Sequence, residues 1–453
     1  MFATINPVNE QLIESFDSLS DKEIEIVLSQ ANLAFKQWRD VSVDERIKSI
    51  LAIGEDLRNN KTQYALTITL EMGKPLTQAI AEVEKCAKLC DYYAQYAPSI
   101  LNNKNIATEF TKSYVQHAPM GTIMGIMPWN FPFWQGIRFS IPALLAGNSI
   151  LLKPAPNVPK SAKIVESIVN KHCMVPNVFQ TILIEVGQVE KILSHRIVKG
   201  VALTGSDRAG SAVATIAGKH IKKSILELGG SDAFVVLKDA DLEKAAETGL
   251  KSRMNNTGQT CISAKRFILD ANIADDFTDL LLNKIQQLQI GDPLQAETNL
   301  SSLARPDLND LLDTQVQKSI GLGAQAILEG GPMDRPGSYY SPTVLTNINP
   351  HMPAFHEELF GPVVSIFRVK NEVEALRLAN DTIYGLGASI WSKDLDRAER
   401  LAWQIDTGIV AINDMVKSDP RMPFGGVKRS GYGRELGTEG LLEFVNVKSI
   451  VAR

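Results

Sequence analysis

The feature that most constrains the fold of this 453-residue chain is a repeated alternation of short apolar strands with helical segments. The first run has a helical segment at Ser161–Lys171 and strand candidates at Ser149–Leu152, Phe179–Ile184, Gly200–Leu203 and Ala233–Leu237. A second run, from about Ser231 to Asn413, has strand candidates at Arg266–Leu269, Val363–Val369, Ala388–Trp391 and Gly408–Ile412. Such alternation favours a mostly parallel sheet covered by helices. We therefore expect an α/β fold with two such units.

The first hundred residues show helical periodicity instead. Apolar residues recur every three or four positions over residues 24–38, which indicates a helix with one buried face. A further helix is expected over about residues 76–96. Two serines stand three positions before a glutamate, the spacing of a capping box at a helix start: Ser20 with Glu23, and Ser42 with Glu45.

The boundary between the two units is expected near residue 230, where the pair Gly229-Gly230 interrupts the strand pattern. We therefore predict one domain at residues 1–230, a second at residues 231–413, and a return segment at residues 414–453.

Composition excludes several classes of protein. The 47 basic and 51 acidic residues give a net charge of −4, and no stretch concentrates the basic ones, so a nucleic-acid partner is not expected. No apolar run reaches the 18 or so residues of a membrane span, and the first residues lack the pattern of a secretory signal. Four cysteines are too few for a disulfide scaffold, which favours a cytoplasmic location. The six histidines are scattered, so no metal site is expected.

The most informative segment ends in Cys261, preceded by small and amide residues from Asn256 onward. We expect it at the entry to a helix, where the helix dipole would lower the pKa of the thiol and create a nucleophile. The alternative is that Cys261 is a small buried apolar residue, as many free cysteines are. Cys86, Cys90 and Cys173 are expected to belong to the core.

Glu227 stands inside an apolar, strand-like run from Ile225 to Leu228. Burial there would raise the pKa of its carboxyl group toward neutrality, as a general base requires. The alternative is a strand-end carboxylate that pairs with Lys222 or Lys223.

Two more segments carry weaker signals. Asn130 stands between Pro128 and Pro132 in an aromatic setting, so its amide is either a rigid donor to a developing oxyanion or a turn residue. A glycine turn at Gly205–Gly210 follows a strand and precedes a helix, which is a common place for a nucleotide phosphate. Its glycines are five apart, so it does not match the G-x-G-x-x-G pattern.

Together these segments resemble the aldehyde dehydrogenase superfamily over nearly the whole chain. Seven motifs carry the resemblance in order: PWNFP at Pro128–Pro132, LLKPAP at Leu151–Pro156, TGS at Thr204–Ser206, LELGG at Leu226–Gly230, GQTC at Gly258–Cys261, EELFGPV at Glu357–Val363 and PFGGVKRSGYGRE at Pro423–Glu435. Within the superfamily the chain looks most like the short bacterial succinate-semialdehyde dehydrogenases. The resemblance implies two Rossmann-like, three-layer domains, one for the cofactor and one for catalysis, with the active site between them.

The resemblance also implies roles for single residues. Cys261 would be the nucleophile, Glu227 the base that activates water, and Asn130 the amide that binds the oxyanion. The residues that match positions at the family's dinucleotide site are Trp129, Lys153, Pro156, Gly205, Ser206, Gly210, Leu228, Glu358 and Phe360.

The sequence departs from the NAD-preferring pattern at Pro156, where such relatives often carry a glutamate for the ribose hydroxyls. Without that carboxylate a 2′-phosphate meets less repulsion, and Lys160 is a candidate to help bind it. We therefore expect NAD as the cofactor, with NADP possible.

Substrate choice is expected to depend on cations near the nucleophile, because a semialdehyde carries a carboxylate at its far end. Arg138 matches the position of a carboxylate-binding arginine in related semialdehyde enzymes, and three further candidates are Arg253, Ser418 and Arg421. For the arginines the alternative is a structural ion pair. The other hypotheses are a different aldehyde substrate, a CoA-acylating enzyme or a non-catalytic NAD-binding protein.

The resemblance finally implies an oligomerisation arm. It would be built from the hairpin near Thr108–Pro119 and the C-terminal strand near Val447–Arg453. In relatives such arms extend the partner's sheet, so we expect a homodimer or homotetramer.

Overall fold

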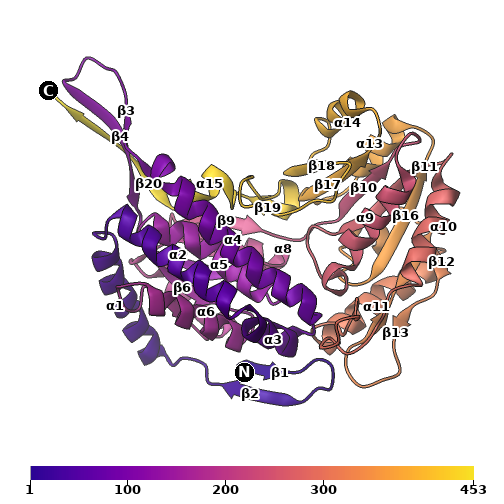
Figure 1. Ribbon diagram of the computed structural model, residues 1–453, viewed down its shortest axis with the longest axis horizontal. Helices are drawn as coiled ribbons and strands as arrows, with labels where there is room; N and C mark the ends of the chain where they lie inside the picture. Colours follow the sequence, from indigo (N-terminus) through magenta and orange to yellow (C-terminus); the bar gives the residue numbers. More distant parts are fainter. Residues whose placement is uncertain (1) are drawn as a thin grey trace.

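The computed structural model describes residues 2–453, and its core consists of two helix-covered sheets that lie side by side (Figure 1). This confirms the α/β fold that the sequence predicts. The predicted boundary near residue 230 stays a prediction; Gly229 and Gly230 lie between the last parallel strand of one sheet and the first strand of the other.

The first sheet has six strands in the spatial order β19 (Gly431–Tyr432), β9 (Lys223–Glu227), β8 (Val198–Thr204), β5 (Thr122–Ile126), β6 (Ser149–Lys153) and β7 (Phe179–Thr181). All pairs among β5 to β9 are parallel, and β19 pairs antiparallel with β9. The chain runs outward from β5 in one direction and then from β8 in the other. The carboxyl ends of β5 and β8 therefore flank a topological switch point, where ligands bind in open α/β sheets.

Alternate residues of these strands face opposite helical layers, as the two-residue period of a strand requires. Ile123 of β5 packs into one apolar cluster and its neighbour Met124 into another. The first cluster includes helices α2 (Val43–Asn59), α3 (Lys61–Met72), α4 (Leu76–Leu101), α5 (Pro132–Leu145) and α6 (Pro159–His172). The second includes α1 (Asp21–Trp38), α7 (Val189–Ser194) and α8 (Asp207–Lys219).

The second sheet has seven strands in the order β12 (Gln325–Leu328), β15 (Thr343–Thr346), β16 (Val363–Val369), β11 (Ala264–Asp270), β10 (Asp232–Val236), β17 (Gly387–Trp391) and β18 (Ile409–Ile412). Helices α9 (Leu242–Met254) and α10 (Ala274–Ile285) share an apolar cluster with one face. Helices α13 (Glu372–Asn380) and α14 (Leu395–Ala402) share a cluster with the other face. Both sheets are thus the middle of three layers.

A three-stranded sheet projects from the body of the molecule, at the upper left of Figure 1. It consists of β3 (Lys104–Asn105), β4 (Lys112–Pro119) and β20 (Val445–Ala452). β20 pairs with β4 along its full length, from Val445 with Pro119 to Ala452 with Lys112. The hairpin and the C-terminal strand predicted to form an arm are therefore joined in one sheet.

The remaining elements connect these parts. They are β1 (Phe2–Ile5), β2 (Leu12–Phe16), β13 (Gly331–Pro332), β14 (Tyr340–Ser341), α11 (Pro306–Gly321), α12 (Pro353–His356) and α15 (Gly437–Leu442). Three short 3-10 helices complete the chain: η1 (Val186–Gln188), η2 (Asn255–Gly258) and η3 (Lys428–Ser430). Among residues 2–453, no helix combines the length and apolar character needed to span a bilayer.

The structure corrects two local predictions. The first hundred residues are not all helical, because β1 and β2 form an antiparallel hairpin before α1. Ser20 and Glu23 form a complete capping box at α1, but at α2 only the bond from the Glu45 N–H to the Ser42 hydroxyl is present. Three predicted core cysteines are buried: Cys86, Cys90 and Cys173.

Candidate active site

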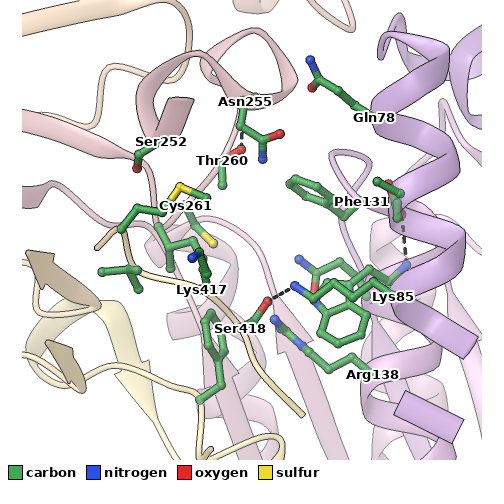
Figure 2. A pocket seen from close by; sticks show the side chains of 18 of the residues that line it. Gln78, Lys85, Phe131, Arg138, Ser252, Asn255, Thr260, Cys261, Lys417 and Ser418 are labelled. Atoms are coloured by element: carbon green, nitrogen blue, oxygen red, sulfur yellow. Dashed lines mark hydrogen bonds between the residues drawn. The ribbon is translucent and has the colours of Figure 1, made fainter. Parts of the chain in front are cut away.

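A pocket of about 240 Å³ lies between α4 and α5 on one side and the end of α9, the loop of Cys261 and the Met415–Ser418 segment on the other (Figure 2). Cys261 lines it, together with side chains of α4, α5, α9 and the segment around Met415–Ser418. Further lining residues are Gln78, Glu82, Lys85, Phe131, Trp134, Arg138, Lys251, Asn255, Thr260 and Phe424.

The backbone before Cys261 turns sharply, and this turn places the thiol in the pocket. Asn256, Thr257 and Gly258 have φ values of +55°, +54° and +77° in succession. A Cβ at Gly258 would come within 2.3 Å of the Gly361 backbone, so only glycine fits at this crossing. Helix α9 ends at Met254, the short 3-10 helix η2 ends at Gly258, and the element that follows Cys261 is the strand β11. The predicted position of Cys261 at a helix entry is therefore wrong.

The electrostatic environment of the thiol also differs from the prediction. Burial, and after it the charge of Glu227, raises the pKa of the Cys261 thiol to about 12, while Lys265 and Arg138 oppose this rise. Cys261 lies in the turn between η2 and β11 and not in the first turn of a helix, which removes the predicted cause of a lowered pKa. A base must therefore take the proton when Cys261 acts as a nucleophile.

Glu227 is the last residue of β9 and is 1% exposed. Neither carboxylate oxygen has a hydrogen-bond partner within residues 2–453, and burial raises the pKa of Glu227 to about 8. The alternative pairings are occupied elsewhere: Lys223 pairs with Glu443 at 2.6 Å, and Lys222 donates to the carbonyl of His195 at 2.7 Å. The desolvated environment predicted for a general base is present.

Asn130 follows β5 and is held against the loop of the nucleophile. Its Nδ2 donates to the carbonyl of Gln259 at 3.1 Å. The backbone carbonyl oxygen of Asn130 accepts hydrogen bonds from Lys74 Nζ at 2.7 Å and from Asn256 Nδ2 at 3.0 Å. The amide is therefore fixed two residues from Cys261, as an oxyanion donor requires.

Sequence reasoning missed the buried pair behind this amide. Lys74 is 1% exposed and pairs with Glu82, whose other oxygen accepts the N–H groups of Phe133 and Trp134 at 3.0 Å each. Glu82 thereby satisfies the first turn of α5, and Lys74 links that helix to Asn130. The sequence signal for this pair was the break in helical periodicity at Met72–Pro75, which places Lys74 just before the start of α4.

Lys265, also missed, joins Cys261 to Glu358. Its ammonium donates to the carbonyl of Cys261 at 2.7 Å and to that of Thr260 at 3.0 Å, and it pairs with Glu358 Oε1 at 3.1 Å. The same Glu358 oxygen accepts the Gly230 N–H at 3.1 Å. The sequence signal for this contact was a lysine four residues after Cys261. It was overlooked because an apolar strand follows it directly, and the structure shows that the lysine is buried.

Several predicted cofactor residues lie at the carboxyl ends of strands of the first sheet. Lys153 ends β6, is 7% exposed, and donates a hydrogen bond to the Pro154 carbonyl at 3.3 Å. Gly205 follows β8, where a Cβ would make an ordinary contact with the Leu203 side chain at 3.6 Å, and Ser206 caps α8. A Cβ at Gly210 would come within 2.6 Å of the Leu228 side chain, so glycine allows close packing there.

Two aromatic residues and a carboxylate complete this set. The rings of Trp129 and Phe360 meet edge to face at 5.8 Å. A buried ammonium, a glycine turn before a helix and the Glu358 carboxylate are groups that suit a dinucleotide's ribose and phosphate oxygens. The residues present therefore fit such a cofactor.

At Pro156 the sequence lacks the glutamate that NAD-preferring relatives often carry, and the structure shows what surrounds this position. The Pro156 carbonyl accepts the N–H of Ala3, so the N-terminal strand β1 lies against this loop. Lys160, the candidate helper for a 2′-phosphate, pairs with Glu14 of β2 at 2.9 Å.

Comparison with known proteins identifies the family that has this arrangement of residues. The model of the aldehyde dehydrogenase family matches residues 1–450. The chain belongs to the aldehyde dehydrogenase family. It is 43% identical over 448 residues to a probable succinate-semialdehyde dehydrogenase [NADP(+)] of Synechocystis sp., covering 99% of each protein. It is 42% identical over 447 residues to succinate semialdehyde dehydrogenase [NAD(P)+] of Escherichia coli, covering 99% of this chain and 97% of that one.

The fold agrees with solved structures of relatives. Succinic semialdehyde dehydrogenase from Streptococcus pyogenes, in complex with NADP+, superimposes with a TM-score of 0.97 at 36% identity, with 99% of each chain covered.

Of the four predicted substrate residues, this aldehyde dehydrogenase brings two to the pocket. Arg138 and Ser418 both line it. The Arg138 guanidinium pairs with Glu435, lies 3.8 Å from Glu227 Oε2 and donates to the Thr204 hydroxyl at 3.3 Å. Ser418 accepts a hydrogen bond from Lys85, a pocket cation that sequence reasoning missed.

The prediction for Arg253 is wrong. Its side chain is fully buried outside the pocket lining and donates to four backbone carbonyls and the Ser263 hydroxyl, so it fastens the loops around Cys261. The prediction for Arg421 is also wrong, because its side chain is 75% exposed, pairs with Asp419 at 2.7 Å and does not line the pocket.

Proposed function

We propose that this aldehyde dehydrogenase oxidises succinic semialdehyde to succinate through a thioester on Cys261, with NAD as the hydride acceptor and NADP also accepted. The observation that carries the proposal is the charge of the pocket in front of Cys261. Four cationic side chains line it, and its one carboxylate, Glu82, is already paired with Lys74. A pocket of this kind favours an aldehyde that carries a second, anionic group. The curated relatives named above have the same substrate in their names.

The reaction begins when Cys261 Sγ forms a bond to the aldehyde carbon. Because the pKa of the thiol is high, we assign its proton to the ionised Glu227 carboxylate. The oxygen that becomes negative is held by the Asn130 amide and the backbone N–H of Cys261. A dinucleotide held by the cofactor residues would supply the acceptor for the hydride, and the product left on Cys261 would be a thioester.

Hydrolysis of the thioester needs a base that is buried and close to neutrality. We assign Glu227 to this step also: after releasing the proton of the thiol to solvent, its carboxylate takes a proton from the attacking water and passes it to the sulfur as the C–S bond breaks, so that Cys261 leaves as the thiol. Burial raises the pKa of Glu227 to about 8, so the carboxylate exchanges protons at the pH at which the reaction runs.

For the cofactor, we assign Lys153, Gly205, Ser206 and Glu358 to the sugar and phosphate groups. Dual use of NAD and NADP is supported by the loop at Pro156, which presents no carboxylate side chain of its own where a 2′-phosphate would repel it. The Lys160 pair with Glu14 limits how much positive charge is available for that phosphate.

We also propose a homodimer or homotetramer built through the arm. β18 is an edge strand of the seven-stranded sheet, and its residues 409–412 are only half-buried in the single chain. On the arm, Val447 and Val451 are 61% and 56% exposed. An edge strand and an exposed apolar strand are suited to pairing with a second copy.

A cytoplasmic location is part of the proposal. All four cysteines are free, and the mechanism needs Cys261 as a thiol. A reducing compartment keeps it in that state.

The test is steady-state reduction of NAD and NADP with succinic semialdehyde, glutaric semialdehyde and butyraldehyde. We expect kcat/KM for succinic semialdehyde to exceed that for butyraldehyde by about tenfold or more, since one ion pair is worth about 1.4 kcal/mol or more. Cys261→Ala should fold and be inactive. An equal kcat/KM on butyraldehyde would leave the family assignment intact but would contradict succinic semialdehyde as the preferred substrate. Added CoA should not raise the rate; if it does, the acyl acceptor is CoA and not water.

A further inference from the structure

The direction of the Asn130 amide depends on its backbone. The side-chain Nδ2 has two hydrogens, and one of them is donated to the Gln259 carbonyl at 3.1 Å. The other is available for the oxygen that becomes negative at Cys261. Within residues 2–453, the Oδ1 atom of Asn130 has no hydrogen-bond partner, so one bond alone fixes the side chain. The direction of the free hydrogen is therefore set by where the backbone of Asn130 is held.

The backbone carbonyl of Asn130 is held from two sides. Asn256 Nδ2 donates to it at 3.0 Å and to the Gln259 carbonyl at 3.2 Å, which ties Asn130 to the loop of the nucleophile. Lys74 Nζ donates to it at 2.7 Å and lies 3.6 Å from the centroid of the Phe131 ring. The bond from the ammonium is charge-assisted and is the stronger of the two. Lys74 is thus the main anchor of the Asn130 backbone.

A rigid turn between α3 and α4 places Lys74 behind Asn130. Gly73 ends α3 with a φ of +76°, and a Cβ there would come within 2.8 Å of the Ser302 carbonyl oxygen. Pro75 follows Lys74 directly and is the N-cap residue of α4. Lys74 is fully buried and is not one of the side chains that line the pocket. It therefore reaches the oxyanion donor without touching the substrate.

Glu82 fixes the ammonium and the start of α5 at the same time. Its Oε2 pairs with Lys74, and its Oε1 accepts the N–H groups of Phe133 and Trp134 at 3.0 Å each. These N–H groups belong to the first turn of α5, which begins two residues after Asn130. One carboxylate thus ties the lysine to the helix, and Asn130 lies between these two anchored points.

Burying a lysine and a glutamate together has a cost that the fold could avoid. Two charges lose their hydration, and apolar residues of similar volume often give equal or greater stability. An apolar pair at positions 74 and 82 would fill the same space, but it could not donate to the Asn130 carbonyl or accept from α5. The bonds around Asn130 are what the charged pair supplies.

We propose that Lys74, held by Glu82, is a positioning residue for the oxyanion donor: its ammonium fixes the backbone of Asn130 and thereby directs the amide at the substrate oxygen. The inference rests on the proposed function, because that mechanism assigns the amide to the oxyanion, but it does not depend on which aldehyde is oxidised. Lys74 takes no part in moving protons or electrons.

The experiment measures kcat and KM of Lys74→Met for succinic semialdehyde and for butyraldehyde with saturating NAD. A small displacement of a catalytic group can lower a rate by about 10²-fold. We expect kcat to fall by about ten- to hundredfold on both aldehydes, while both KM values change less than about threefold, because the oxyanion exists only after Cys261 has attacked. Lys74→Arg should recover part of kcat, since a guanidinium can still donate to the Asn130 carbonyl.

A double-mutant cycle shows whether Lys74 acts through Asn130. Asn130→Ala removes the donor and should lower kcat by about 10²–10³-fold. Adding Lys74→Met to Asn130→Ala should then lower kcat by less than about threefold, because there is no amide left to direct. If the two losses multiply instead, Lys74 only supports the structure and the inference is overturned.

Two further variants separate positioning from a folding defect. Removing one partner of a buried pair is destabilising, so Lys74→Met/Glu82→Gln removes both charges and keeps an amide oxygen for the N–H groups of α5. If Lys74→Met does not fold, as judged by circular dichroism, this double variant carries the same cycle. Lys61→Met is the matched control: Lys61 pairs with Glu84 on the same helix α4, but its side chain is 41% exposed, and kcat should not change.

The outcomes for the two proposals are distinguishable. A wild type that does not prefer succinic semialdehyde contradicts the proposed substrate, but the cycle on butyraldehyde still tests Lys74. A kcat equal to that of the wild type in folded Lys74→Met or Lys74→Met/Glu82→Gln would overturn the inference and leave the proposed function intact. If Asn130→Ala itself keeps the wild-type kcat, the oxyanion assignment fails and the inference fails with it.

Discussion

The ammonium of Lys265 donates a hydrogen bond of 2.7 Å to the carbonyl oxygen of Cys261, and it also pairs with Glu358 at 3.1 Å. One buried cation thus connects the nucleophile to the carboxylate assigned to the cofactor. Its charge also lowers the pKa of Cys261, against the effect of burial.

Replacing Lys265 with Met is therefore expected to affect both sites. The thiol should ionise less readily, so we expect alkylation of Cys261 by iodoacetamide at pH 8 to slow by about tenfold, which corresponds to one pKa unit. The KM for NAD should rise because Glu358 loses a cation that orients it.

The matched control is Lys284→Met, which removes a lysine whose partner is Glu243 on the surface far from the pocket. It should leave the alkylation rate and the KM for NAD unchanged. Unchanged alkylation in Lys265→Met would show that the lysine only supports the backbone of the loop.

The pH dependence of turnover should report Glu227. The pKa of this carboxyl is raised from 4.5 to about 8, so its basic form is scarce below that pH and accumulates as the pH rises. We expect kcat to increase with pH up to about 8 and then to level. Glu227→Gln should lose this limb and fall in kcat by about 10²–10⁴-fold, the usual contribution of a general base.

Burst kinetics distinguish the two assignments for Glu227. If it serves mainly in thioester hydrolysis, the variant should still release one equivalent of NADH per active site in a fast phase. If it also takes the thiol proton, the burst itself should slow and become strongly pH-dependent. A wild-type profile that is flat from pH 6 to 9 would contradict both assignments.

How much the sequence could predict depends on the range of the interactions involved. The alternation of strands and helices follows from the local spacing of apolar residues, so the two helix-covered sheets could be predicted. The apolar run around Glu227 indicated its burial, but the same run also allowed a strand-end carboxylate paired with Lys222 or Lys223, and only the structure decides between them. The hairpin of β1 and β2 was missed because it is short and largely exposed in β2.

The errors in the site come from contacts between segments far apart in the chain. Arg253 differs from Arg138 only in what surrounds it, and the carbonyls of Leu359 and Gly361 that bind Arg253 lie more than 100 residues away. The turn before Cys261 depends on three consecutive left-handed residues, which no helix or strand period reveals. Lys85 was overlooked because a lysine on an amphipathic helix ordinarily faces solvent.

Arg253→Met tests the structural role that replaces its predicted role in substrate binding. Several buried carbonyls would lose their donor, which is expected to lower the free energy of unfolding by about 3 kcal/mol or more. Urea unfolding followed by tryptophan fluorescence measures this change. The KM of whatever folded enzyme remains should stay close to that of the wild type.

Arg421→Ala provides the contrast for this measurement. Its exposed pair with Asp419 is screened by solvent and contributes little, so stability and KM should both be nearly unchanged. A large rise in KM for succinic semialdehyde in either arginine variant, at unchanged stability, would restore the original assignment to that residue.

The pair of Lys160 with Glu14 predicts how cofactor preference can be shifted. Glu14→Gln should free the Lys160 ammonium and remove a negative charge beside the loop at Pro156. Because both side chains are about two-fifths exposed, the pair is weak, and we expect the KM for NADP to fall by no more than about fivefold. The KM for NAD, which has no 2′-phosphate, should stay the same. Glu10→Gln, on the turn between β1 and β2, is the control for a general change in charge. Equal effects of both variants on NADP would mean that long-range charge, and not Lys160, is responsible.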